Sequence, residues 1–411
     1  MSRFLFSTAP LPGHIDWGGL LQTAVHLQTA GHEVCWVSGS AIQSQIAAAG
    51  IPFHEAPVAY HPPAGSVDLE ERGFVDEMGL TLDVWLNETA VAAATNAHLD
   101  FITMWQPDVI IADPLVLAAA LASEVAGIPL AGCGYPGAFT VISNHSDLKF
   151  VAAELAERKQ RLRNRFALPP ETEEASRTFL FIAPKLHLVY FTESWFAAHN
   201  PAPSPGVQYV GGQQQRPQTA APEWMEQVVG KRPLIAIAQS TTYGTFSRWL
   251  PDICDAINQM GAVGILAADA KAAEPLGPLP PNIHIVPWLP YDHLLPHVTA
   301  VIHHGGTGTT HRAICHGVPQ LILPQVADQF IHAMAVNQHG NGKMLLPWHL
   351  SKDAIFNKLK EVVVNQTIHR AAQKLQNQFA QLGGVPQAAH LLISLAQNSN
   401  ESILTNLEMQ R

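Results

Sequence analysis

The clearest candidates for chemistry in this sequence lie in one turn, His304–Thr309 (HGGTGT), which follows the apolar run Ala300–His303. An apolar run that enters a glycine-rich turn and continues with helical spacing predicts a strand, a turn and a helix start. The first amides of a helix have no partner within the helix, and glycines let a ligand approach the backbone closely. The turn therefore favours the binding of a phosphate or a similar anion.

The elements that must position this turn alternate between strand-like and helix-like segments. In the first half of the chain, buried-strand patterns alternate with helical spacing, as in Gly18–Ala30 and Val84–Met104. This alternation predicts βαβ units and a parallel sheet. The predicted strands of this half are Phe4–Ala9, Glu33–Val37, Val109–Ala112, Ile128–Gly132 and Leu186–Phe191.

The alternation starts again after a segment rich in Pro and Gln. This segment, His199–Pro222, predicts a linker between two domains. We expect an N-terminal domain over residues 1–205, a C-terminal domain over 206–385, and a last helix within 386–411 that could pack back on the first domain. The predicted strands of the second domain are Leu234–Ala238, Ala262–Ala267, Ile283–Val286, Ala300–His303 and Leu321–Leu323.

Both halves thus predict an α/β fold of two doubly wound, Rossmann-like parallel sheets. Ligands of such sheets bind beyond the carboxyl ends of the strands, where the strand order reverses. The turn at His304 follows a strand and lies at such an end. The stretch Val58–Gly79 breaks the alternation with Pro, Gly and acidic residues and is longer than a compact connection requires, so we expect it to form a pocket wall.

Size and composition restrict the possible classes of protein. A chain of 411 residues is long enough for two α/β domains, and 47% hydrophobic residues supply their cores. A net charge of −10 disfavours a nucleic-acid partner, and the four separated cysteines indicate neither disulfides nor a zinc site. The N-terminal apolar run is too short for a signal peptide, and no run is long enough for a membrane span, so we expect a cytoplasmic protein.

The segment Val301–Gln329 closely resembles the nucleotide-sugar signature of family 1 glycosyltransferases, which have the two-domain GT-B fold. The resemblance includes the His-x-Gly turn, Gly317-Val318-Pro319 and Asp328-Gln329. This ordered set is far more specific than an isolated glycine motif. It implies transfer of a sugar from a nucleotide diphosphate to a small, lipophilic acceptor, as in the glycosylation of secondary metabolites.

The resemblance implies donor-binding roles for residues of the C-terminal domain. His304 would contact the diphosphate, and Trp288 would stack on the base with its broad indole face. The Asp328–Gln329 pair would hydrogen-bond sugar hydroxyls. The other residues assigned to the donor are Ser240, Gly306, Thr307, Gly308 and Thr309.

The N-terminal domain carries the second part of the resemblance, in Pro12-Gly13-His14 after the first strand. In the family this turn histidine is the general base, and a strand-end aspartate, here Asp113, orients it. An imidazole suits this work because its ordinary pKa lies near cellular pH. Without the resemblance, His14 would be read as a surface residue and Asp113 as a helix cap.

The implied reaction is a single displacement at the anomeric carbon with inversion of configuration. Backbone amides of the glycine turn and His304 would stabilise the charge that develops on the diphosphate. The sequence contains no Asp-x-Asp pair. We therefore expect no metal and no cofactor, and a UDP- or dTDP-hexose, most simply glucose, as co-substrate.

The sequence departs from the family pattern at several positions. Arg312 stands where many relatives have a glutamate that grips the ribose hydroxyls, which opens the choice between UDP and dTDP. Tyr291 replaces a frequent glutamine beside Trp288, and Trp17 replaces a proline near His14. Asp16 is close enough in sequence to compete with Asp113 as the partner of His14.

Three other functions remain open at this point: a catalytically silent helper protein, a sugar-nucleotide epimerase of the same shape, and a dinucleotide dehydrogenase. The intact His14 and Asp328-Gln329 count against the helper, although Arg312 counts slightly for it. An epimerase would need acidic groups around the sugar in place of the His14 turn, and the absence of a GxGxxG motif counts against the dehydrogenase. The basic run Arg158–Arg165 permits contact with an anionic membrane surface, although such runs are more often solvated helix faces.

Overall fold

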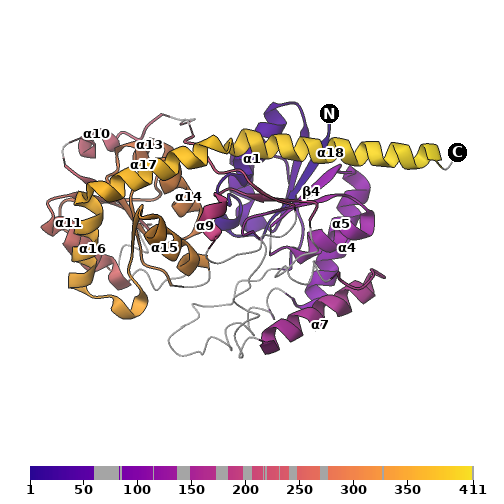
Figure 1. Ribbon diagram of the computed structural model, residues 1–411, viewed down its shortest axis with the longest axis horizontal. Coiled ribbons are helices and arrows are strands. Elements are labelled where there is room, and N and C mark those ends of the chain that lie inside the picture. The colour runs from indigo at the N-terminus through magenta and orange to yellow at the C-terminus, as the bar shows by residue number, and fades with distance from the viewer. Residues whose placement is uncertain are drawn as a thin grey trace. The chain divides into compact units, whose positions relative to one another are not determined.

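The structure is a computed structural model that divides into two compact units (Figure 1). Unit 1 comprises Met1–Val210 and Gly384–Arg411, and unit 2 comprises Gly211–Gly383. The described residues are 1–59, 83, 86–113, 115–136, 149–172, 184–197, 206–215, 217, 220–230, 232–239, 248–268, 276–325 and 328–409, with backbone alone for 149–152 and 399–409.

Unit 1 is built on a seven-stranded parallel sheet in the order β3-β2-β1-β4-β5-β6-β7. The order reverses between β1 and β4, where Ser7 lies opposite Ala112. Thr8 and Asp113 therefore leave the sheet side by side. The strands are β1 (Arg3–Ser7), β2 (Glu33–Ser38), β3 (Phe53–Glu55), β4 (Val109–Ala112), β5 (Leu130–Cys133), β6 (Leu186–Val189) and β7 (Val207–Tyr209).

Helices cover both faces of this sheet because successive strand residues point to opposite sides. In β1, Leu5 packs into one apolar core, and Phe4 and Phe6 pack into the other. Helices α4 and α5 contribute to the first core, and α1 and α18 contribute to the second. The helices of unit 1 are α1 (Leu20–Thr29), α2 (Gln43–Ala48), α4 (Glu88–Trp105), α5 (Leu117–Ala126), α7 (Lys149–Arg165), α9 (Glu193–Phe196) and α18 (Gly384–Met409), with 3-10 turns η1 (Pro12–His14) and η2 (Ser40–Ile42).

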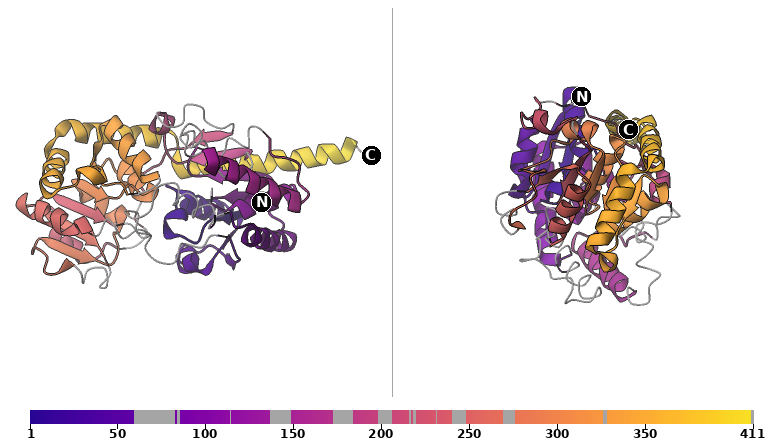
Figure 2. Two further views of the ribbon diagram at one scale, coloured as in Figure 1. Left: turned by 90° about the horizontal axis from the view of Figure 1, so that it is seen from below. Right: turned by 90° about the vertical axis from the view of Figure 1, so that its left-hand side faces the viewer.

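The last helix belongs to unit 1 although it follows unit 2 in sequence. Helix α18, the long yellow helix in Figures 1 and 2, packs against α1 and places Ala388, Leu392 and Ala396 in the second core. The N–H of Gly384 donates to the carbonyl of Val210 (2.7 Å), so the helix begins beside the end of unit 1's first segment.

Unit 2 is built on a six-stranded parallel sheet in the order β10-β9-β8-β11-β12-β13. Here the order reverses between β8 and β11, where Ala238 lies opposite His303. Gln239 and His304 therefore leave the sheet side by side. The strands are β8 (Leu234–Ala238), β9 (Val263–Ala267), β10 (Ile283–Val286), β11 (Ala300–His303), β12 (Gln320–Ile322) and β13 (Gly342–Met344).

Two apolar cores flank this second sheet in the same way, with Ile235 and Ile237 facing one and Ala236 facing the other. The helices of unit 2 are α10 (Met225–Val228), α11 (Leu250–Gln259), α13 (Tyr291–Leu294), α14 (Thr307–Cys315), α15 (Asp328–His339), α16 (Lys352–Val364) and α17 (Gln366–Gln381), with 3-10 turns η6 (Leu295–His297) and η7 (Pro347–His349).

The predicted fold class, two doubly wound parallel-sheet domains, is confirmed. Part of the expected linker differs from its prediction. Val207–Tyr209, inside the stretch expected to be linker, forms the edge strand β7 because it pairs in parallel with β6. Residues 60–79 of the expected pocket wall lie outside the described residues. Among the described helices, none combines the length and apolar character needed to cross a membrane.

Candidate functional site

His14 and Asp113 meet at the point where the strand order of unit 1 reverses. His14 ends the 3-10 turn η1 after β1, and Asp113 directly follows β4. The His14 Nδ1 lies 2.7 Å from Asp113 Oδ2, and the Asp113 side chain is fully buried, whereas His14 is about one-fifth exposed. The structure therefore brings together two residues that are far apart in sequence and leaves part of the imidazole open.

The surroundings of Asp113 determine which nitrogen of His14 carries the proton. Oδ2 also accepts from the N–H of Ala9 (3.2 Å), and Oδ1 accepts from the N–H of Leu115 (2.8 Å). A carboxylate held by donors can only accept from His14, so Nδ1 carries a proton and, in the neutral ring, Nε2 holds the lone pair. This tautomer is the one that a proton-accepting imidazole needs.

Trp17 lies edge-on to the His14 ring, with ring centroids 4.9 Å apart. Its backbone has φ of +37°, a left-handed conformation that a bulky residue rarely adopts. An added Cβ on Gly134 would lie 2.9 Å from the Trp17 ring, so glycine at 134 leaves room for the indole. The indole thus occupies space beside the imidazole.

Asp16, the other candidate partner of His14, lies just before α1, and its backbone carbonyl accepts hydrogen bonds at the start of that helix. Its carbonyl accepts from the N–H groups of Gly19 (2.5 Å) and Leu20 (2.6 Å). The Asp16 carboxylate also contributes to the raised pKa of Tyr190, whose main cause is burial. A hydrogen bond of 2.7 Å joins His14 Nδ1 to the Asp113 carboxylate.

In unit 2, the turn between β11 and α14 depends on its glycines. Gly305 has φ of +97°, and an added Cβ would lie 2.9 Å from the carbonyl oxygen of Gln329. An added Cβ on Gly306 would lie 2.5 Å from His304 Nε2, so glycine there leaves room for the imidazole. Gly306 is the N-cap of α14 and makes no side-chain cap, and a Cβ on Gly308 would meet no described atom within 4 Å. The helix start therefore offers amides and open space to an anion.

The two histidines at the end of β11 differ in their roles. His303 is fully buried, bonds Gln320 Oε1 through Nε2 (2.9 Å) and accepts from the N–H of Gly305 (3.1 Å). Burial lowers the pKa of His303 to about 3, so the ring is neutral and supports the turn through its hydrogen bonds. Burial also lowers the pKa of His304, although the charge of Asp328 opposes the effect. An anion beside His304 would favour its protonated form.

The two threonine hydroxyls of the turn bond protein groups. Thr307 Oγ1 donates to Asp328 Oδ2 (2.9 Å), and Thr309 Oγ1 lies 3.0 Å from Tyr291 Oη. Tyr291 begins α13, so its hydroxyl ties the segment after Trp288 to the first turn of α14. The backbone amides, more than these hydroxyls, are the groups that the turn offers to a phosphate.

Trp288 follows β10 with 59% of its surface exposed. An isolated tryptophan at such a position would ordinarily be expected in the core, because burial of a large aromatic surface is favourable. Gln329, by contrast, is buried, and its Oε1 accepts from the N–H of Gln325 (2.9 Å). Ser240 lies outside the described residues. Beside it, the Gln239 amide donates to the carbonyl of Ala267 (3.1 Å), which ties the ends of β8 and β9 together.

Arg312 on α14 is held by two neighbours on α13. Its Nη1 donates to Asp292 Oδ1 (3.1 Å), and its guanidinium lies 5.7 Å from the centre of the Tyr291 ring. The arginine that replaces the family's glutamate at position 312 therefore has a carboxylate nearby, and its guanidinium pairs with that carboxylate. Asp292 did not stand out in the sequence because nothing in the chain between positions 292 and 312 indicates this contact.

Comparison with known proteins assigns the chain to a family. Models of the N-terminal and C-terminal domains of erythromycin biosynthesis protein CIII-like proteins match residues 25–180 and 252–390. The chain is 25% identical to 4'-demethylrebeccamycin synthase of Lentzea aerocolonigenes, over 96% of this chain and 99% of that protein. It is 26% identical to 3-alpha-mycarosylerythronolide B desosaminyl transferase of Saccharopolyspora erythraea, over 90% and 92%.

A solved structure shares the fold of the chain. The glycosyltransferase VinC, in complex with dTDP, superposes with a TM-score of 0.74 at 20% identity, over 96% of this chain and all of that one. The chain belongs to the EryCIII-like, bacterial family 1 glycosyltransferases. It is therefore an enzyme that transfers a sugar from a nucleotide donor. A silent helper, an epimerase and a dehydrogenase are no longer needed as alternatives.

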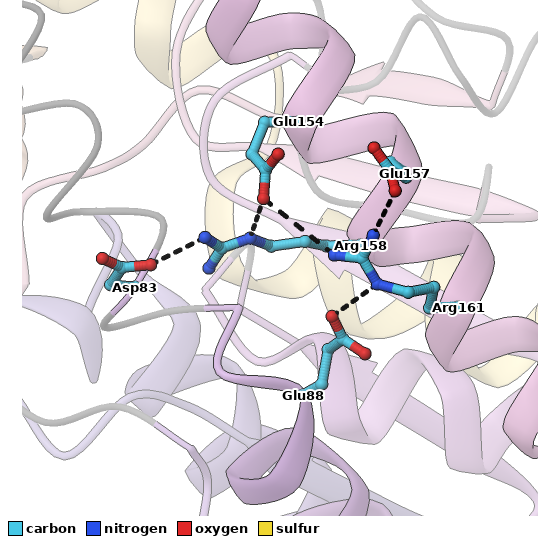
Figure 3. A network of polar contacts seen from close by, with 6 residues as sticks. All are labelled: Asp83, Glu88, Glu154, Glu157, Arg158 and Arg161. Atoms are coloured by element: carbon cyan, nitrogen blue, oxygen red, sulfur yellow. Dashed lines mark hydrogen bonds and ion pairs between the residues drawn. The ribbon is translucent and has the colours of Figure 1, made fainter.

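The basic run of α7, which permits contact with an anionic membrane surface, is paired with acidic residues in the structure. Four basic residues of the helix each meet a carboxylate, and Figure 3 shows two of them between acidic neighbours. The pairs are Arg158 with Asp83 and Glu154 (2.7 Å each), Arg161 with Glu88 (2.6 Å) and Glu157 (2.5 Å), Lys159 with Glu171, and Arg163 with Glu124 (2.7 Å). Positive charges already matched by carboxylates attract an anionic surface weakly. The alternative interpretation, an ion-paired helix face, agrees with the contacts of Arg158 and Arg161, whereas Lys159 and Arg163 are buried in their ion pairs.

Proposed function

We propose that this glycosyltransferase moves a hexose, most simply glucose, from a dTDP- or UDP-sugar to a hydroxyl of a small lipophilic acceptor with inversion of configuration. The single observation that carries the mechanism is the 2.7 Å contact between His14 Nδ1 and the buried Asp113 carboxylate. The contact supports a proton-accepting Nε2 on a partly open imidazole at the reversal of the strand order, where doubly wound sheets bind ligands.

The proposed step forms one C–O bond and breaks another while a proton moves from the acceptor hydroxyl to His14. His14 Nε2 removes the proton of the acceptor hydroxyl while that oxygen attacks the anomeric carbon from the face opposite the diphosphate. The bond from the anomeric carbon to the diphosphate oxygen breaks, and the nucleoside diphosphate leaves with the electron pair. The charge of Asp113 stabilises the imidazolium that forms.

On the donor side, the glycine turn of unit 2 supplies the electrostatics. Amides at the start of α14, the positive end of that helix and His304 would offset the charge on the leaving diphosphate. Trp288 would stack on the base with its exposed indole. Ser240 would add a hydroxyl beside the phosphates.

The sugar-binding role is proposed for Asp328 and Gln329 at the start of α15. Asp328 is more than one-third exposed, and an acid and an amide together can hold adjacent hydroxyls. A relative named as a desosaminyl transferase supports a widening of the proposal from glucose to deoxyhexoses. The VinC complex with dTDP supports a thymidine nucleotide as one donor.

A transfer assay tests this function directly. Wild-type enzyme would be incubated with dTDP-glucose or UDP-glucose and a panel of phenols, sterols, carotenoids and macrolides, and products would be identified by mass spectrometry. We expect a hexosyl adduct of at least one lipophilic acceptor, and its anomeric proton coupling should report the inverted configuration. A retained configuration would exclude the single displacement through His14.

Glycosyl transfer is expected to keep its full rate in excess EDTA. The positive end of α14, the backbone amides and His304 would replace a cation at the diphosphate. Initial rates with EDTA would be compared with rates after addition of Mg²⁺ or Mn²⁺. A strict requirement for either cation would contradict the proposal.

UDP-glucose and dTDP-glucose are expected to react at rates within about tenfold of each other, or about 1.4 kcal/mol. A carboxylate that accepted hydrogen bonds from both ribose hydroxyls would favour UDP, which has the 2′-hydroxyl, over dTDP. Arg312 stands at that position instead and donates a hydrogen bond to Asp292. The measurement is a competition between both donors for one accepted acceptor. A preference above about a hundredfold for UDP-glucose, or about 2.7 kcal/mol, would show that another group reads the ribose.

A further inference from the structure

A hydrogen-bonded chain of three side chains joins the glycine turn to the start of α15. Thr307 Oγ1 donates to Asp328 Oδ2 (2.9 Å) and lies 3.1 Å from His332 Nε2. His332 Nε2 is also 3.8 Å from the same carboxylate oxygen. Asp328 and His332 are four residues apart on α15, so they share a face of that helix.

The direction of the protons in this chain follows from the groups involved. A carboxylate only accepts hydrogen bonds, and a threonine hydroxyl has one proton to donate. Because that proton points to Asp328, the Thr307 oxygen must accept from His332, and Nε2 of His332 carries a proton. The result is an ordered chain from His332 through Thr307 to Oδ2 of Asp328.

The burial of the three residues shows which end of the chain is available to a ligand. The His332 side chain is 2% exposed, whereas the Asp328 side chain is 38% exposed. The buried members therefore hold one oxygen of an open carboxylate. Fixing Oδ2 orients Oδ1, because the two oxygens of a carboxyl group move together.

We infer that Thr307 and His332 are positioning residues that orient the Asp328 carboxylate toward a hydroxyl of the donor sugar, an inference that rests on the proposed function. The Thr307 hydroxyl thus serves the sugar and not the diphosphate, although it lies in the turn predicted to bind phosphate. His332 was not singled out in the sequence. Its spacing of four residues from Asp328 on a helix is the signal that could have indicated it.

The test compares binding of the intact donor with binding of the nucleotide alone. Isothermal titration calorimetry would give the Kd of dTDP-glucose and of dTDP for the wild type and for Thr307→Val, which keeps the shape but removes the hydroxyl. We expect the Kd of dTDP-glucose to rise about tenfold, or about 1.4 kcal/mol, with the Kd of dTDP unchanged. Thr307→Ser should restore donor binding, and His332→Phe should reproduce the loss.

A matched control removes a hydroxyl elsewhere on the same helix. Thr310 Oγ1 donates to the carbonyl of Gly306 (2.9 Å), so Thr310→Val tests loss of a buried helix hydroxyl without contact to Asp328. We expect the ratio of the Kd of dTDP-glucose to the Kd of dTDP to be the same in this variant as in the wild type. In an Asp328→Asn background, Thr307→Val should cause no further loss, because the residue on which it acts has already changed.

Three outcomes would overturn the inference. The first is an equal loss of affinity for dTDP and dTDP-glucose in Thr307→Val, which would assign Thr307 to the phosphates or to stability. The second is a full additional loss in the Asp328→Asn background. The third is unchanged donor binding in Thr307→Val, which would leave the proposed function intact. If the wild type bound neither dTDP-glucose nor UDP-glucose, the proposed function would fall together with the inference.

Discussion

Replacing His14 with alanine is expected to slow glycosyl transfer by about 10²- to 10⁴-fold, the usual contribution of a positioned general base. The variant is expected to keep the fold because His14 ends a short 3-10 turn and does not contribute to an apolar core. The glycine turn, Trp288 and Asp328 all belong to unit 2. Binding of dTDP or UDP should therefore stay at the wild-type level while turnover falls.

The measurement is kcat with saturating donor and acceptor, together with calorimetric binding of dTDP. His26→Ala is a matched control because His26 also lies in the first helical region of unit 1 but is exposed near the end of α1. It should turn over at the wild-type rate. Near-normal turnover of His14→Ala would remove His14 from the mechanism.

Replacing Asp113 with asparagine is expected to lower kcat by about 10- to 100-fold, which corresponds to the loss of one hydrogen bond to a charged group. The reason is the tautomer of His14. An amide that turns its NH₂ toward Nδ1 would favour the proton on Nε2, and Nε2 could then no longer accept a proton. The effect should be smaller than that of His14→Ala because part of the imidazole population retains the useful tautomer.

Asp113 also holds two backbone amides, so its substitution can weaken the fold. Thermal unfolding and the fraction of enzyme that binds dTDP would be measured, and kcat would be expressed per binding-competent molecule. Asp16→Asn is the comparison variant and should reduce kcat less. If Asp16→Asn were the more damaging change, Asp16 would be the partner that orients His14.

The strands that the sequence predicted best are those with a continuous apolar run between turn residues. Val109–Ala112, Leu234–Ala238 and Ala300–His303 form strands with the predicted bounds. A strand buried on both faces needs apolar residues at every position, so its pattern is visible without knowledge of its neighbours. The edge strands Val207–Tyr209 and Gly342–Met344 were not predicted, because three-residue strands carry too short a pattern.

The placement of candidate residues at strand ends followed from the same logic. His304 and Asp113 each follow a predicted strand, and parallel strands present their carboxyl ends at one edge of a sheet. The sequence could therefore name the residues at each edge. It left the choice between Asp16 and Asp113 open. In the folded chain, His14 forms a hydrogen bond with Asp113, which lies 99 residues further along the sequence.

By itself, the sequence determined the fold class, the family and the glycine turn, because these depend on local periodicity and on an ordered motif within one stretch of chain. Only the tertiary structure decided which polar groups meet: Arg312 with Asp292, Thr307 with Asp328 and His332, and the arginines of α7 with their carboxylates. A hydrogen bond forms or fails within a few tenths of an ångström. That precision comes from strand register and helix packing, which bring distant positions together and which spacing along the chain does not encode.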